Sequence, residues 1–116
     1  GDDVEQCMMP IRANMALYIG GMGARDKNFY NNYAKALGFA DAAVEIQDLF
    51  LAGRKDEAAA AVPAELIDAC HLVGPAERIK ERLQRWKTAG NNGQVASMLL
   101  GCQQPEALEL IASEVL

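Results

Sequence analysis

The stretch from Leu17 to Asn31, LYIGGMGARDKNFYN, holds three glycines within four residues, and its interpretation decides what the chain can be. It fits either a helix end followed by a loop or a glycine-rich loop that approaches a bound phosphate closely. A P-loop needs a lysine directly after its last glycine, and a dinucleotide-binding fingerprint needs a glycine where Asp26 stands. Both fingerprints fail, so the stretch favours a helix end. A loop that contacts a cofactor is the alternative, and its four candidate residues are Gly20, Gly21, Gly23 and Lys27.

Helical patterns flank this stretch on both sides. Before it, apolar residues recur at spacings of three and four from Met8 to Tyr18. Pro10 lies in that run, and it is suited to the first turn of a helix that begins there. After the stretch, Asn28 is suited to cap a second helix, which Gly38 would end.

The rest of the chain predicts further helices over residues 42–53, 55–62, 64–72, 76–90 and 105–116. Asp41 is suited to cap the first of these, Gly90 would end the fourth, and Pro105 would begin the last. Residues 94–101, QVASMLLG, are short and apolar and form the one good strand candidate. A single strand cannot form a sheet, so this segment either pairs outside the chain or is not a strand. The predicted fold class is therefore mainly α: a small multi-helix domain over residues 1–116 with at most a short strand.

Composition narrows the classes of partner and site. The 116 residues suffice for one domain, and the net charge of -5 argues against a general affinity for nucleic acid or anionic membrane. No apolar run approaches the roughly 20 residues of a membrane span. The three cysteines lie far apart and form no C-x-x-C pair. This pattern predicts reduced thiols in a cytoplasmic protein, and it predicts no metal site. Cys70 and the sole histidine, His71, are adjacent on one predicted helix, so they point in different directions and do not form a nucleophile–base pair.

Residues 63–89 have the pattern of a helix, a tight turn and a second, basic helix, as in helix-turn-helix proteins that bind DNA. Arg78, Arg82 and Arg85 follow spacings of four and three, share a face, and are the candidate nucleic-acid-binding residues. The opposing interpretation is a solvated amphipathic helix with ion pairs such as Glu81–Arg85. The acidic remainder of the chain favours this second interpretation.

Three segments of the sequence, taken in order, resemble a known family. They are residues 16–39 (ALYIGGMGARDKNFYNNYAKALGF), residues 40–68 (ADAAVEIQDLFLAGRKDEAAAAVPAELID) and residues 72–90 (LVGPAERIKERLQRWKTAG). Together with the apolar run and the final helix, they resemble the C-terminal region of the luciferase-like monooxygenase superfamily, in its deazaflavin-dependent oxidoreductase branch. The resemblance covers nearly the whole chain. It implies a (β/α)8 barrel that passes hydride between a substrate and coenzyme F420 or flavin mononucleotide.

The same resemblance implies that much of the barrel is missing. A (β/α)8 barrel takes about 250 residues, so this chain corresponds to a C-terminal fragment without the strands whose ends carry most cofactor and catalytic groups. We therefore expect no catalysis and no bound cofactor for this chain alone, and we assign no catalytic residue. The 94–101 segment would be a late barrel strand without its neighbours. Apolar faces that the rest of a barrel would cover predict self-association.

Overall fold

The computed structural model describes residues 1–116 and contains helices but no strand. The seven helices are α1 (Val4–Gly21), α2 (Phe29–Ala36), α3 (Ala40–Leu51), α4 (Lys55–Ala60), α5 (Ala64–Cys70), α6 (Ala76–Asn91) and α7 (Pro105–Val115). The mainly-α class is confirmed. None of these helices combines the length and the apolar composition that crossing a bilayer requires.

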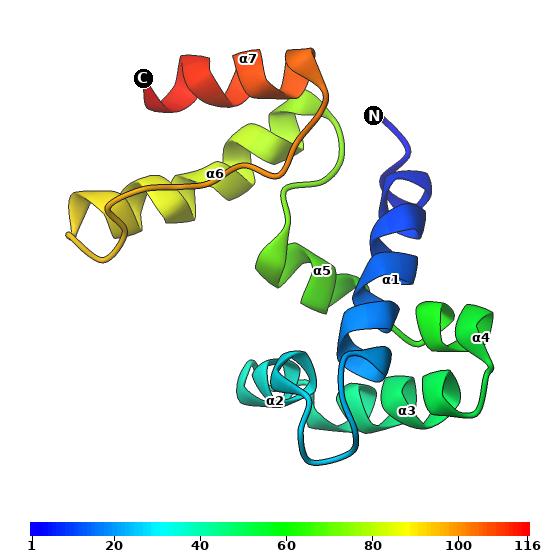
Figure 1. The fold of residues 1–116 in the computed structure, drawn as a ribbon. Coiled ribbons are helices and arrows are strands. Elements are labelled where there is room, and N and C mark those ends of the chain that lie inside the picture. Colours follow the sequence, from blue (N-terminus) through cyan, green and yellow to red (C-terminus); the bar gives the residue numbers. More distant parts are fainter. The chain divides into compact units, whose positions relative to one another are not determined.

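The chain divides into two compact units. The larger unit comprises residues 5–71, and the smaller unit comprises residues 1–4 and 72–116. In the larger unit, α3 contacts both α2 and α4 (Figure 1). Its fully buried large side chains are Met8, Ile46, Val62, Leu66, Ile67 and Asn28. Buried alanines lie among them, and their small side chains let helices approach one another closely: Ala16, Ala34, Ala43 and Ala58.

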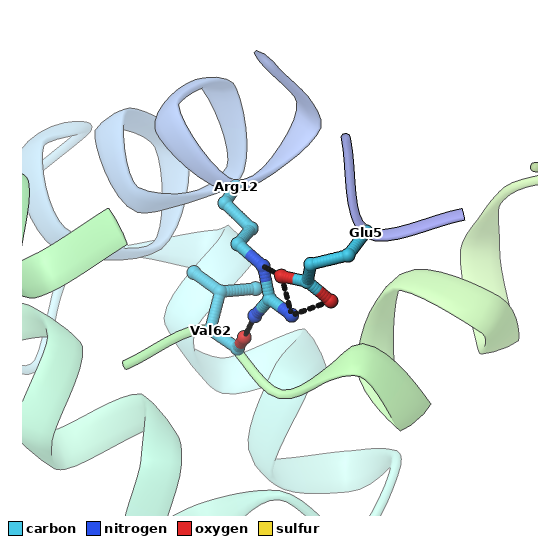
Figure 2. Close-up of polar contacts among 3 residues, drawn as sticks. All are labelled: Glu5, Arg12 and Val62. Carbon is cyan, nitrogen blue, oxygen red and sulfur yellow. Dashed lines mark hydrogen bonds and ion pairs between the residues drawn. The ribbon is translucent and has the colours of Figure 1, made fainter. Parts of the chain in front are cut away.

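A largely enclosed arginine, Arg12, joins two distant parts of the larger unit. The guanidinium of Arg12, on α1, donates to the backbone carbonyl of Val62, between α4 and α5 (Figure 2). Its Nε also donates to Glu5 Oε1 at 3.1 Å. Only 15% of the Arg12 side chain is exposed. The charge is therefore compensated by a carboxylate and a carbonyl, which a buried guanidinium requires.

The smaller unit is built on α6 and α7, which contact each other. The extended residues 94–104 return along α6 (Figure 1), and Lys87 Nζ lies 4.0 Å from Glu114 Oε2 near the ends of both helices. The two helices therefore run in the same direction. Leu83, in the middle of α6, is fully buried, which agrees with the apolar face expected for this helix.

Several helix boundaries match the sequence expectations. The Asn28 side chain caps α2 by accepting from the Asn31 backbone N–H, Gly38 follows α2 with a φ of 97°, and α7 begins at Pro105. Two caps differ: Phe39 rather than Asp41 precedes α3, and α6 continues through Gly90 to Asn91. After α6 ends, Gly93 is the residue that adopts the left-handed conformation, with a φ of 74°.

One sequence expectation is wrong. The first helix begins at Val4, and Pro10 lies inside it on the exposed surface. An 18-residue helix tolerates the loss of one backbone hydrogen bond where the proline ring faces solvent. Residues 94–101 form no strand, which is one of the two outcomes that the sequence left open, because the chain offers no second strand with which their backbone could pair. Leu99 in this segment is 95% exposed.

Candidate functional site

Two glycines of the opening stretch, Gly20 and Gly21, lie at the end of α1 against α3, and Gly23 lies in the loop that follows. A Cβ added to Gly20 would come within 2.5 Å of Phe50 Cβ, and one added to Gly21 would come within 2.4 Å of the Phe50 ring. Gly23 has a φ of 153°, and a Cβ there would come within 2.5 Å of the Lys27 carbonyl oxygen. Packing thus favours glycine at position 20 and backbone conformation favours it at position 23, whereas the clash at Gly21 involves only the Phe50 ring.

Two buried asparagines close the end of α1. Asn28 Nδ2 donates to the carbonyl oxygens of Tyr18 and Ile19, both at 3.0 Å. Asn31 Nδ2 donates to the carbonyl oxygens of Ile19 at 3.1 Å and Ala43 at 2.8 Å. Helix-terminal carbonyls need such partners when they are buried. This pair was predicted only in part, because the sequence indicated the cap at Asn28 but not the contacts of Asn31.

The basic residues of the stretch lie on the surface. Arg25 forms an ion pair with Asp48 of α3, and both side chains are about half exposed. Lys27 is exposed, and its backbone N–H donates to the Ala24 carbonyl at 3.0 Å. Packing therefore accounts for the glycines without a ligand. Cofactor binding by Gly20, Gly21, Gly23 and Lys27 stays a prediction.

The larger unit contains a hollow of about 260 Å³, which we call the aromatic hollow. Residues of α1, α2 and α5, together with His71, line it: Asn14, Met15, Tyr18, Ile19, Tyr30, Tyr33, Ala34, Leu66, Cys70 and His71. The rings of Tyr18 and Tyr30 meet edge to face with centroids 4.8 Å apart. Sequence reasoning missed this site. Its one available signal was three tyrosines close to the glycine stretch, at positions 18, 30 and 33.

The histidine of this hollow has an enclosed nitrogen. Nδ1 of His71 is buried and has no hydrogen-bond partner. Cys70 and His71 both line the hollow, but no carboxylate does. The lining therefore lacks the carboxylate that would orient the histidine in a set of nucleophile, base and orienting group. No group of three or more histidine, cysteine or carboxylate side chains is placed to hold a metal ion.

The smaller unit brings the three predicted nucleic-acid-binding arginines together. Arg78, Arg82 and Arg85 line a second hollow of about 270 Å³ with Glu81, which we call the arginine hollow. Arg78 Nη1 donates to the Val73 carbonyl at 2.7 Å, and the Arg85 guanidinium lies 5.4 Å from the centre of the Trp86 ring. These contacts use part of Arg78 and of Arg85 within the protein itself. Nucleic-acid binding stays a prediction.

The segment predicted to resemble a helix-turn-helix does form two helices, α5 and α6. They belong to different compact units, because the division falls between residues 71 and 72. A helix-turn-helix reader holds its two helices in a fixed arrangement, so that the first crosses the backbone while the second enters the major groove. Helix formation at 63–89 is therefore not evidence for that motif.

Two comparisons with known proteins point to the same family. The sequence profile of the luciferase-like monooxygenases matches residues 1–93. A protein of Mycobacterium tuberculosis (strain ATCC 25618 / H37Rv), named "Putative coenzyme F420-dependent oxidoreductase", is 37% identical over 89 residues. That alignment covers 77% of this chain and 26% of the relative, so the chain spans about a quarter of the relative's length. No solved structure matches the chain.

Proposed function

Because the chain belongs to the luciferase-like monooxygenase family, we propose that it is the C-terminal part of a coenzyme F420-dependent oxidoreductase. The observation that carries this proposal is the 37% identity, over most of the chain, to a relative whose name states that activity. Within such an enzyme the chain supplies a helical layer around the reaction site.

The chain turns over no substrate by itself in this proposal. Its match occupies a quarter of the relative's length, and a barrel of this family needs the strands that carry cofactor and catalytic groups. The aromatic hollow also contains no carboxylate that could pair with His71 in acid–base chemistry. Coenzyme F420 or flavin mononucleotide would be held by the longer protein.

Calorimetry with the purified chain tests whether the chain alone binds a coenzyme. We expect no heat of binding on titration with coenzyme F420 or with flavin mononucleotide up to micromolar concentrations. A circular dichroism spectrum dominated by helix would show that the chain used in the titration is folded. Saturable binding of either coenzyme would mean that the chain alone carries the site.

A chimera tests the family role directly. In it, this chain replaces the matched segment of the M. tuberculosis relative. We expect the chimera to bind coenzyme F420, since the replaced helices would pack in the same order. A matched chimera with Gly20→Ala places a methyl group 2.5 Å from Phe50 Cβ and is expected to bind the coenzyme more weakly. A well-folded first chimera without affinity for the coenzyme would overturn the proposal.

We also propose that exposed apolar surface makes the isolated chain associate with itself. Large apolar side chains are exposed on both units, including Phe29 at 71% and Leu99 at 95%. Water disfavours such surface when it is contiguous, and a partner copy would cover it. Sedimentation velocity at rising concentration should show a growing dimer or oligomer fraction, and Leu99→Ser should reduce it. A concentration-independent monomer would rule the proposal out.

A further inference from the structure

The aromatic hollow lies entirely within the larger unit, so its shape depends on α1, α2 and α5 alone. Its polar and aromatic groups come from Asn14 and Tyr18 on α1, Tyr30 and Tyr33 on α2, and His71 after α5. The remaining wall is apolar and includes Met15, Ile19 and Leu66. Aromatic walls with a few polar groups are typical of small-molecule sites.

Charge and size restrict the occupant. No lysine, arginine, aspartate or glutamate lines the aromatic hollow, so an ionised ligand would lose its hydration without gaining a counter-charge. A phosphate-bearing coenzyme therefore does not fit. The volume of about 260 Å³ is at or below the small end of ligand pockets, which run from about 300 to 1,000 Å³. An occupant of one or two rings matches that space.

His71 supplies a directional group. A proton on Nδ1 would have no acceptor, because that nitrogen is enclosed without a partner. In the tautomer that leaves Nδ1 without a proton, Nε2 is the hydrogen-bond donor of the ring. A ligand oxygen that accepts from Nε2 would give the bound ring one orientation.

We propose that the aromatic hollow binds a compact, neutral aromatic molecule that bears a hydroxyl or carbonyl oxygen. Its ring packs among Tyr18, Tyr30 and Tyr33, where edge-to-face contacts are already present between Tyr18 and Tyr30. Its oxygen accepts from His71 Nε2. The proposal goes beyond the oxidoreductase assignment, because it involves no coenzyme and no redox step.

Phenol is the probe, and the full chain is titrated while its backbone amide NMR signals are followed. We expect saturable shifts for residues 30–34 and 66–71. Cyclohexanol, which has similar size but no aromatic ring, should bind about tenfold more weakly. Benzoate should not bind, because the hollow offers its charge no partner. Unsaturable shifts spread over both units, or benzoate binding as strong as phenol binding, would overturn the proposal.

Two neighbouring aromatic residues give a matched pair of variants. Tyr33 and Phe29 are stacked on each other with centroids 6.3 Å apart, and both are more than half exposed. Only Tyr33 lines the aromatic hollow. Tyr33→Ala should weaken phenol binding about tenfold, whereas Phe29→Ala should change it less than about twofold. Equal losses in the two variants would show that phenol contacts the exposed α2 surface and not the hollow.

A third variant tests the hydrogen bond. His71→Phe keeps an aromatic ring in the wall and removes the donor. It should weaken phenol about tenfold and leave the affinity for toluene, which has no oxygen, nearly unchanged. Equal effects on the two probes would remove His71 from the site. None of these measurements uses coenzyme F420, so their outcome tests the aromatic hollow independently of the oxidoreductase proposal.

Discussion

At the scale of single residues, Asn31 connects α2 with the end of α1 and with α3. Its side chain is 2% exposed and donates to carbonyl oxygens of Ile19 and Ala43. Asn31→Ala removes both donors from a buried site, and we expect the free energy of unfolding to fall by about 1–3 kcal/mol. Asn32→Ala, at the exposed next position, should change it by less than about 0.5 kcal/mol. Urea denaturation followed by circular dichroism measures both, and equal losses would contradict this account.

Gly20 and Gly21 differ in the atoms that a methyl group would meet. At Gly20 these include Phe50 Cβ at 2.5 Å and the Ile46 carbonyl oxygen at 3.2 Å, which cannot move without the backbone of α3. At Gly21 the nearest atoms belong to the Phe50 ring, which can rotate. Gly20→Ala should therefore cost about 1–3 kcal/mol of unfolding free energy. Gly21→Ala should be close to neutral, because rotation of the Phe50 ring relieves most of the clash and the higher helix propensity of alanine, up to about 1 kcal/mol, offsets the rest.

Urea midpoints of the two glycine variants test this difference. Adding Phe50→Leu should restore whatever Gly21→Ala loses but should not rescue Gly20→Ala, whose clash also involves backbone. A Gly20→Ala protein as stable as the parent would show that α1 and α3 do not approach each other this closely.

At the scale of elements, Pro10 is the clearest local conflict. It is the seventh residue of α1, faces solvent and has no N–H to donate to the preceding turn. Pro10→Ala should raise the unfolding free energy by about 1–3 kcal/mol. Pro105→Ala is the matched control, because the first position of α7 has no helical hydrogen bond to lose. Thermal unfolding of both variants measures the difference, and a similar melting temperature for Pro10→Ala and the parent would contradict it.

The sequence predicted the individual helices better than it predicted the packing contacts between them. Local chemistry set the ends of α2 and the start of α7, because Asn28, Gly38 and Pro105 act through their own backbone neighbourhoods. The sequence left open whether residues 94–101 form a strand, because a strand depends on a partner that lies elsewhere. The aromatic hollow was missed for the same reason. Its tyrosines come from two helices, and the spacing within one helix does not show which face of another it will meet.

At the scale of the whole molecule, charge limits any binding to nucleic acid. The chain carries a net charge of -5, and the arginine hollow includes Glu81 beside its three arginines. Three phosphate contacts would give a salt slope of about -2.7, which lowers affinity about 40-fold between 50 and 200 mM salt. We therefore expect duplex DNA to associate weakly at low salt and to dissociate near physiological ionic strength.

Fluorescence anisotropy with random and selected duplexes at two salt concentrations measures this, using two double variants with the same change of charge. Arg82→Glu with Arg85→Glu alters the arginine hollow, and Lys27→Glu with Lys35→Glu alters exposed lysines of the larger unit. Non-specific attraction depends on overall charge, so both doubles should weaken low-salt association to a similar extent. Sub-micromolar, sequence-dependent binding at physiological salt that only the arginine double abolishes would instead make α6 a nucleic-acid-binding helix. The family assignment would then describe the ancestry of the chain but not all of its function.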